Sequence, residues 1–315
     1  MQAPVFADVV AAREFISPYL PKTPLVRSHK LSEALSCDYY LKLENLQPVG
    51  AFKVRGGVNL VGREPGGTLV TASTGNHGQS IAYAGRLFDT RVIIYAPAEN
   101  TNPAKLQAMR DLGAEVRLHG RDFDEARLET ERAAAAEGFR YVHSANEPRL
   151  IAGVGTIGLE IFEDLPEVDV IIAPAGGGSC ASGNCLVAHE LNPNVKVIAV
   201  QSEGAPAMWH AWRNRNLEPY PTMKTEHEGL ATRVPFEMTN QILWDLLSDF
   251  VLVTDEQIND AIRLLARDAK QLVEGSGAAS LAAAIKLREE LRGKKVVGIV
   301  SGGNLPLDRF ARLLA

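Results

Sequence analysis

The feature that most restricts the fold of this chain is a repeated alternation between short apolar runs and longer helical patterns. The apolar runs are rich in β-branched residues and have the length of buried strands; they cover residues 39–44, 68–72, 91–95, 114–118, 168–173, 195–201, 250–253 and 295–300. Helical patterns lie around them at residues 7–20, 30–37, 76–88, 102–112, 122–137, 150–165, 181–191, 237–248, 255–273 and 276–291. Continuous apolar strands that alternate with helices indicate parallel sheets with helices on both faces. The sequence therefore predicts an α/β fold.

The chain has 315 residues, which is enough for two domains or for one large α/β unit. No internal repeat and no low-complexity linker divides the sequence. If there are two domains, one must therefore be inserted into the other, so that the chain crosses between them more than once.

Charge and composition exclude several kinds of partner. The net charge is −5 and no basic block interleaved with aromatic residues is present, so we expect no nucleic-acid partner. No apolar stretch approaches the length needed to span a bilayer, so we expect no membrane partner. The first residues carry no basic leader, and Cys37, Cys180 and Cys185 form neither a paired framework nor a CxxC motif. We therefore expect a cytoplasmic protein with reduced thiols.

One lysine stands at a break between a strand and a helix. Lys53 follows a strand that ends at Glu44 and the breakers Pro48 and Gly50, and a helical pattern begins there. Lysines at helix starts usually point into water. The residues around Lys53, Phe52 among them, are apolar, and an ammonium in such surroundings loses hydration and proton affinity. Lys53 is therefore a candidate free-amine nucleophile that can form a Schiff base.

Two turns between a strand and a helix are candidate anion sites. Residues 73–77 connect the strand 68–72 to the next helix, and their small and hydroxyl residues could simply cap that helix. Residues 174–179 follow the strand 168–173 and contain three successive glycines, which could also form a tight turn without a ligand. Such turns lie at the carboxyl ends of parallel strands and expose backbone N–H groups. We interpret the first turn as suited to an anion, such as a carboxylate, and the second as a phosphate site.

Two further motifs are less informative by themselves. The sequence Ser301-Gly-Gly-Asn304 follows the last predicted strand and is, alone, only a turn. Gly153, Gly155 and Gly158 match the GxGxxG fingerprint of dinucleotide-binding proteins. That fingerprint requires a preceding strand and an acidic residue at the end of the next strand, and neither is present here. NAD is therefore the less favoured cofactor, and these glycines are predicted to pack closely at a helix start.

The segment Glu44–Lys53, taken with these turns, resembles the Schiff-base segment of the fold-type II pyridoxal-phosphate (PLP) enzymes. The similarity is closest to the serine/threonine dehydratases (ammonia-lyases) and serine racemases, and it covers essentially the whole chain. It implies PLP as the cofactor and a tryptophan synthase β-like fold of two parallel-sheet, three-layer domains. Residues 1–67 and 146–315 would form a large, discontinuous PLP-binding domain, and residues 68–145 a small mobile domain.

The resemblance also implies roles for individual residues. Lys53 would carry PLP as a Schiff base, with Phe52 packed beside the ring. Asn76 would contact the 3-oxygen of the ring, and Ser301 its pyridine nitrogen. The phosphate of PLP would be bound by Gly176, Gly177, Gly178 and Ser179. The carboxylate of the substrate would be bound by Ser73, Thr74, Gly75, Asn76 and His77.

These assignments imply an elimination reaction. A neutral hydroxyl at Ser301 leaves the PLP ring a weaker electron sink than a carboxylate would, which favours loss of a β-leaving group. We therefore expect a carbon–oxygen lyase that converts a β-hydroxy amino acid (threonine, serine or a 3-hydroxy analogue) to a 2-keto acid and ammonia. A racemase would share the cofactor residues, but serine racemases have a serine where this chain has Thr74. A β-replacement synthase would share the fold, and a non-catalytic amino-acid-binding module would not need Lys53.

The resemblance also bears on metals, assembly and selectivity. Many family members bind a divalent cation through a glutamate and an aspartate that correspond here to Gln201 and Ala207, so we expect no metal site. We expect a homo-oligomer, specifically a dimer. Side-chain selectivity is expected from the irregular segment 202–235. Trp209 and Trp212 in that segment are predicted to pack against a core or a subunit rather than line an aryl pocket.

Overall fold

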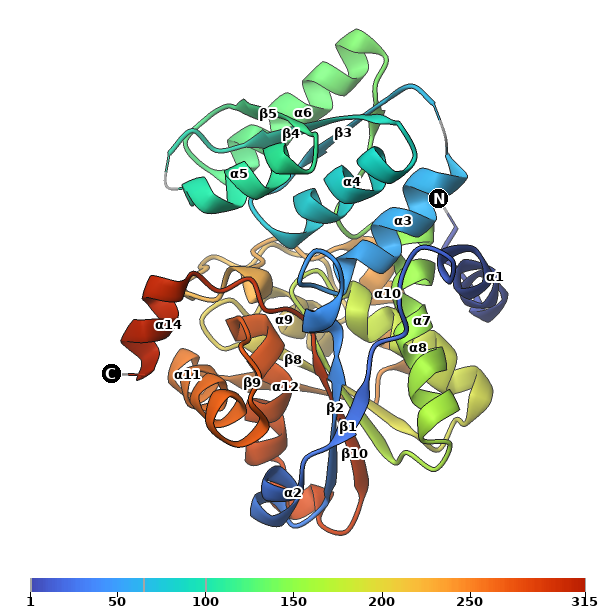
Figure 1. Ribbon diagram of the computed structural model, residues 1–315, viewed down its shortest axis with the longest axis vertical. Coiled ribbons are helices and arrows are strands. Elements are labelled where there is room, and N and C mark those ends of the chain that lie inside the picture. The colour runs from blue at the N-terminus through green and yellow to red at the C-terminus, as the bar shows by residue number, and fades with distance from the viewer. Residues whose placement is uncertain (1, 65, 100, 315) are drawn as a thin grey trace.

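Two sheets carry the fold (Figure 1). The structure is a computed structural model and describes residues 2–64, 66–99 and 101–314. The larger sheet has six strands in the order β1-β2-β10-β7-β8-β9, namely β1 Leu25–Arg27, β2 Asp38–Leu43, β10 Lys295–Val300, β7 Val170–Pro174, β8 Lys196–Ser202 and β9 Asp249–Val253. The smaller sheet has four strands in the order β5-β4-β3-β6, namely β5 Glu115–Leu118, β4 Arg91–Ala96, β3 Thr68–Ala72 and β6 Arg140–Tyr141. Among these strands only β1 pairs antiparallel with its neighbour.

Helices cover both sheets. The α-helices of the described residues are α1 Phe6–Ile16, α2 His29–Leu35, α3 Lys53–Arg63, α4 Asn76–Leu87, α5 Pro103–Asp111, α6 Phe123–Glu137, α7 Pro148–Asp164, α8 Ser179–Leu191, α9 Ala207–Asn214, α10 Glu237–Leu246, α11 Asp255–Leu264, α12 Gly275–Lys286, α13 Arg288–Leu291 and α14 Leu307–Leu314. Figure 1 shows α4, α5 and α6 around the small sheet, with α3 between the two sheets.

The large sheet is buried on both faces, and β10 lies in its middle. Val296 of β10 is opposite Tyr39 of β2 on one side and Val170 of β7 on the other. Successive side chains of a strand point to opposite faces. Val297 accordingly packs into the core beneath α1, α7, α8 and α10, whereas Val296 packs into the core beneath α2, α11 and α12. This two-sided burial explains why the strand is a continuous apolar run.

The small sheet repeats this arrangement. Leu69 of β3 packs with Ile81 of α4 and with residues of α3, while Val70 packs on the other face against Ala126 and Ala133 of α6. Both sheets therefore form the middle layer of a three-layer unit. The predicted α/β fold class with two parallel sheets is confirmed.

Several elements differ from the prediction. The strands β1 and β6 and the helices α9 and α14 are not predicted by the apolar pattern, because each is short or partly exposed. The helix predicted over 255–273 is α-helical only to Leu264. A π-helical turn, Leu265–Ala269, follows it, and Lys270 ends that turn in a left-handed conformation with φ 58°.

The GxGxxG motif lies inside helix α7 rather than at a turn between a strand and a helix. A Cβ at Gly153 would lie 2.5 Å from the carbonyl oxygen of Arg55, and one at Gly183 of α8 would lie 2.7 Å from the backbone nitrogen of Gly155. These glycines therefore permit α3, α7 and α8 to approach closely, as predicted, but they lie in the middle of α7 rather than at its start. A dinucleotide fingerprint is ruled out at this position, because no strand leads into the motif.

No helix in the described part of the chain combines the length and apolar character that a membrane crossing requires.

Candidate active site

Lys53 is the first residue of α3 and its amine points into the protein. The loop before it turns at Gly50, which has φ +67°. The Nζ atom lies 3.1 Å from Ser179 Oγ and 3.3 Å from the carbonyl oxygen of Ser144, and 5.3 Å from the centre of the Phe52 ring. Loss of hydration lowers the pKa of Lys53 to about 8. The prediction that this lysine is desolvated rather than pointed into water agrees with this position.

A buried cluster of charges fixes the start of α3. Arg55 Nε is 2.7 Å from Glu44 Oε2, and Arg55 Nη2 is 2.8 Å from Glu160 Oε2. Lys42 Nζ lies 2.6 Å from the same Glu160 oxygen. All four of these side chains are at most 1% exposed. Because Arg55 is two residues from Lys53 in α3, the cluster fixes the start of α3, and with it the lysine, against β2 and α7.

The glycine turn after β7 faces the amine of Lys53. Thr232 Oγ1 donates to the carbonyl oxygen of Gly176, and Thr239 Oγ1 donates to that of Gly177, both at 2.9 Å. Gly178 has φ +84°, a conformation that favours glycine, and α8 begins at the next residue. The threonine bonds fix the turn, and the first N–H groups of α8 have no acceptor within the helix, so they can bind an anion.

The turn after β3 offers its backbone rather than its side chains. Ser73 Oγ accepts hydrogen bonds from the backbone N–H of Gly78 at 2.9 Å and of Gly75 at 3.2 Å. His77 Nε2 is 2.9 Å from Thr71 Oγ1, and burial together with nearby positive charge lowers the pKa of His77 to about 3. The hydroxyl of Ser73 thus caps α4, and the imidazole of His77 is neutral and bonded within the protein. A Cβ at Gly75 would meet nothing within 4 Å, so there is open space at this turn.

The turn after β10 is joined to the Lys53 loop. The backbone N–H of Phe52 donates to the carbonyl oxygen of Ser301 at 3.0 Å, and Ala51 forms an isolated antiparallel bridge with Gly302. Asn304 Nδ2 donates to Asn76 Oδ1 at 2.8 Å. The fourth predicted motif therefore lies against both the lysine loop and the start of α4.

The structure thus brings the predicted residues of all four motifs to one place, at the carboxyl ends of β2, β3, β7 and β10. Contacts of the site that the sequence did not predict are made by Ser144, Thr232, Thr239 and Glu274. The threonines give no signal in the sequence, because threonine is common in loops and helices. Glu274, an acidic residue before a Gly-Ser-Gly turn, could have been noticed, but it looks like an ordinary helix start.

The segment 202–235 wraps beside the site and contains α9 and a short 3-10 helix, Glu228–Leu230. Trp209 Nε1 donates to the carbonyl oxygen of Phe250, Trp212 Nε1 donates to that of Leu243, and both rings pack against the large core. The prediction that these tryptophans are packing residues is confirmed. Lys105 of α5 reaches across from the small sheet to Glu228 Oε2, 2.6 Å away.

The predicted loss of a metal site concerns Gln201 and Ala207. Gln201 is buried on β8 and its Oε1 accepts a hydrogen bond from the backbone N–H of Trp209 at 3.1 Å, at the start of α9. Among the described residues, one group of possible metal ligands lies elsewhere, at Glu226, His227 and Asp255. The carboxylate of Asp255 already accepts hydrogen bonds from Ser202, Thr225 and the backbone N–H of Glu226, so this group forms a hydrogen-bonded joint between loops.

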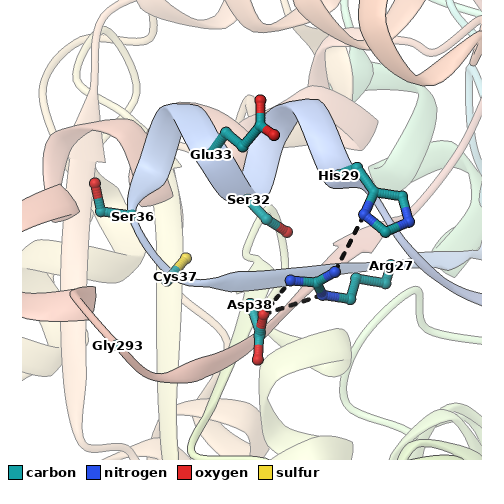
Figure 2. Close-up of a pocket in the computed structure, with 8 residues that line it drawn as sticks. All are labelled: Arg27, His29, Ser32, Glu33, Ser36, Cys37, Asp38 and Gly293. Atoms are coloured by element: carbon teal, nitrogen blue, oxygen red, sulfur yellow. Dashed lines mark hydrogen bonds and ion pairs between the residues drawn. The ribbon is translucent and has the colours of Figure 1, made fainter.

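A separate surface depression, shown in Figure 2, has a volume of about 490 Å³ and lies beside α2. Its lining includes Arg27, Asp38 and Cys37, and Arg27 is hydrogen-bonded to Asp38. Asp38 is the first residue of β2, whereas the lysine loop follows the last residue of that strand. The depression therefore lies at the opposite end of the sheet from the candidate site.

The residues of the candidate site fit PLP. An amine with a lowered pKa suits attachment of an aldehyde. The glycine turn provides N–H groups for a phosphate at a short distance from that amine, and a Cβ at Gly176 would collide with the carbonyl oxygen of Gly229. This crowding restricts position 176 to glycine.

Comparisons with known proteins agree with this geometry. The family described as "Pyridoxal-phosphate dependent enzyme" matches residues 16–302. An L-threonine ammonia-lyase of Thermotoga maritima is 38% identical, over 98% of this chain and 77% of its own length. The processed form of threonine deaminase isoform 2 from Solanum lycopersicum superposes with a TM-score of 0.91 at 30% identity, covering 98% of this chain and 90% of that one. Maize serine racemase superposes with a TM-score of 0.93 at 28% identity, covering 99% and 97%.

The family model matches most of the chain, and the sequence identity to the Thermotoga maritima enzyme is well above that of unrelated proteins. The tomato threonine deaminase shares the fold over 98% of the chain. The predicted cofactor, PLP, and the predicted lyase class are confirmed by these relatives, and a non-catalytic binding module is not supported. The chain belongs to the family of pyridoxal-phosphate dependent enzymes and, within it, is similar to threonine ammonia-lyases.

Proposed function

We propose that this enzyme removes ammonia from a β-hydroxy amino acid, with L-threonine as the first substrate to test. The names of its relatives support threonine, and the single observation that carries the chemistry is the placement of the Lys53 amine 3.1 Å from Ser179 at the head of the glycine turn. A primary amine of lowered pKa beside a phosphate-binding turn is the arrangement that a PLP enzyme needs.

We propose the following roles for holding the cofactor. Lys53 would be the attachment point, with Phe52 against the ring. The turn from Gly176 to Ser179 would hold the phosphate through its backbone N–H groups. Asn76 would contact the 3-oxygen of the ring, and Ser301 would contact its pyridine nitrogen.

The substrate would be oriented by the turn after β3. Its carboxylate would accept hydrogen bonds from backbone N–H groups between Ser73 and His77 other than that of Gly75, which donates to Ser73 Oγ, next to the open space at Gly75. Thr74 would lie beside that carboxylate. The neutral imidazole of His77 adds no charge there, because it is bonded to Thr71.

Bound PLP supplies an electron sink for the pair of electrons left when the Cα–H bond of the substrate breaks. We propose that Lys53 Nζ, released from its own attachment, takes that proton. The Cβ–O bond then breaks and the hydroxyl leaves as water. Ser179 Oγ, in contact with Nζ, can pass the proton from Lys53 to the leaving hydroxyl, so that the base is neutral again. Water later hydrolyses the released enamine to a 2-keto acid and ammonia.

The test is release of keto acid and ammonia from threonine, serine, 3-hydroxyaspartate and phenylserine by the purified enzyme. Lys53→Ala should lose this activity and the visible absorption of bound PLP together. Lys196→Ala, which removes an exposed lysine at the start of β8, should retain both. Turnover by Lys53→Ala at the rate of the unaltered enzyme would refute the assignment.

A second candidate function is amino-acid racemisation, which the structural similarity to maize serine racemase favours. Thr74 stands where serine racemases have a serine, and a threonine there speaks for elimination. Chiral analysis of the amino acid recovered after incubation distinguishes the two reactions, because a racemase would produce the D-enantiomer.

We also propose that residues 68–145 form a small domain inserted between two parts of a large one, 1–67 and 146–315. The four-stranded sheet built from residues in the inserted range supports this division. We further propose a homodimer, to be tested by light scattering, and a cytoplasmic location, which the free thiols of Cys37, Cys180 and Cys185 support.

A further inference from the structure

A chain of polar side chains joins the two sheets beside the Lys53 loop. Asn304 follows β10, Asn76 begins α4 of the small sheet, and Glu274 and Ser276 lie at the start of α12. Asn304 Nδ2 donates to Asn76 Oδ1 at 2.8 Å, Asn76 Nδ2 donates to Glu274 Oε1 at 2.6 Å, and Ser276 Oγ donates to the same oxygen at 2.8 Å. Only Asn76 has a role in the proposed function.

These bonds determine which way the amide of Asn76 faces. Asn304 Nδ2 also donates to the carbonyl oxygen of Val49 at 2.9 Å, so the atom of Asn304 at this point must be its nitrogen. The Asn76 atom that it contacts must then be an acceptor, the amide oxygen. The amide nitrogen of Asn76 therefore faces Glu274. An amide nitrogen has two hydrogens, and Glu274 takes one of them.

Glu274 is held firmly enough to act as a fixed acceptor. It is the residue before the first turn of α12, and its Oε1 would be only 2.5 Å from a Cβ at position 302. Burial raises the pKa of Glu274, while its hydrogen bonds to Ser276 and Asn76 and the charge of Lys105 oppose that rise. In either protonation state Oε1 keeps its two donors, because a protonated carboxyl group can carry its hydrogen on the other oxygen.

We propose that Glu274 is a positioning residue for the cofactor, which fixes the Asn76 amide so that its second N–H stays free to donate to the 3-oxygen of PLP. The proposal rests on the contact between Asn76 and PLP in the proposed function. Without Glu274 the amide of Asn76 would be held only by the bond from Asn304 to its oxygen, and its nitrogen would lose the acceptor that fixes it. Residues that orient a contacting group in this way commonly change cofactor affinity as much as the contact itself.

The experiment measures PLP binding to the apoenzyme by titration, together with the visible absorption band of the bound cofactor. Glu274→Met keeps most of the side-chain volume but removes the acceptor. We expect PLP binding about tenfold weaker, the size of one lost oriented hydrogen bond, and a shifted band, because the 3-oxygen is conjugated with the ring. Glu274→Gln keeps an acceptor oxygen and should bind within about twofold of the unaltered enzyme.

Two further variants make the result specific. Glu256→Met makes the same change at an exposed position in the first turn of α11 and should alter neither readout. In an Asn76→Ala background, Glu274→Met should have no further effect on PLP binding, because the residue acts through Asn76. If Glu274→Met does not fold, Glu274→Ala is read in the same way.

The inference is overturned if Glu274→Met binds PLP within about twofold of the unaltered enzyme with an unchanged band, or if Gln at this position is as damaging as Met. Failure of the proposed function looks different. In that case Asn76→Ala itself would leave PLP affinity and the band unchanged, and Glu274 would have nothing to position.

Discussion

The amine of Lys53 lies where a protonated lysine is poorly hydrated, and this has a measurable consequence. With a pKa of about 8 rather than 10.5, about one molecule in ten carries a neutral amine at pH 7, against fewer than about one in a thousand for an ordinary lysine. The rate at which apoenzyme takes up PLP should therefore rise about tenfold per pH unit and level off near pH 8. Stopped-flow growth of the visible band measures this rate.

The two imidazoles on which the charge of this lysine acts, His77 and His143, cannot produce such a profile. Burial lowers the pKa of His77 to about 3 and that of His143 to about 4, so both are neutral throughout the range. Lys196→Ala serves as the control for surface amines. An uptake rate that still rises above pH 9.5 would contradict the lowered pKa of Lys53.

At the scale of single residues, the sequence predicts the groups that contact a ligand better than the groups that hold them. Lys53 and the glycine turn can be recognised because their types and order are unusual for their positions. Glu274 and Thr239 cannot, because their importance arises from residues distant in sequence, at Asn76 and Gly177. Glu274 meets Asn76 only when the two sheets are placed against each other, and Thr239 meets Gly177 only when α10 packs beside the turn after β7.

At the scale of elements, α3 is held by Arg55, whose guanidinium bonds both Glu44 and Glu160 from a side chain that is 1% exposed. Arg55→Met would leave two buried carboxylates short of a partner. We expect it to lower the free energy of unfolding by about 3–5 kcal/mol, measured by urea denaturation.

Arg13 provides a matched control for this change. It reaches Glu160 Oε1 at 2.9 Å, but from a side chain that is 23% exposed. Arg13→Met should cost only about 1 kcal/mol or less, because water can replace part of the lost interaction. Equal losses for the two variants would show that burial does not determine the importance of Arg55.

The elements themselves were predicted where the apolar pattern is continuous. The strand 295–300 coincides with β10, since burial on both faces requires apolar residues along it, and the helix 76–88 differs from α4 by one residue. The strand β6 has only two residues, and α9 has exposed residues among its buried ones, so their patterns are too short or too mixed to identify.

At the scale of the whole molecule, Glu160 connects α7 to α1, α3 and β2 through Arg13, Arg55 and Lys42. Burial alone would raise the pKa of Glu160, but the hydrogen bonds and charges of Arg55 and Lys42 outweigh it and lower the pKa to about 2. The folded pKa is thus below the unfolded value of 4.5. Its contribution to stability is present above pH 4.5 and is lost as the pH falls toward 2.

We therefore expect the free energy of unfolding to fall between about pH 4.5 and pH 2, with Glu160 contributing a slope of up to about 1.4 kcal/mol per pH unit. Urea denaturation at several pH values measures this slope. Glu160→Gln should be less stable at neutral pH but should lose less stability on acidification. Parallel pH profiles for the two proteins would exclude this role.

The position of β10 has a consequence for how the chain is made. Of the six strands of the large sheet it comes last in sequence, yet it lies between β2 and β7. A nascent chain leaving the ribosome therefore carries β2 and β7 as two unpaired edges until residues 295–300 emerge. We expect the chain to depend on chaperones that shield such edges during translation. Because the turn after β10 lies against the lysine loop, the chain can bind PLP only after β10 has been synthesised.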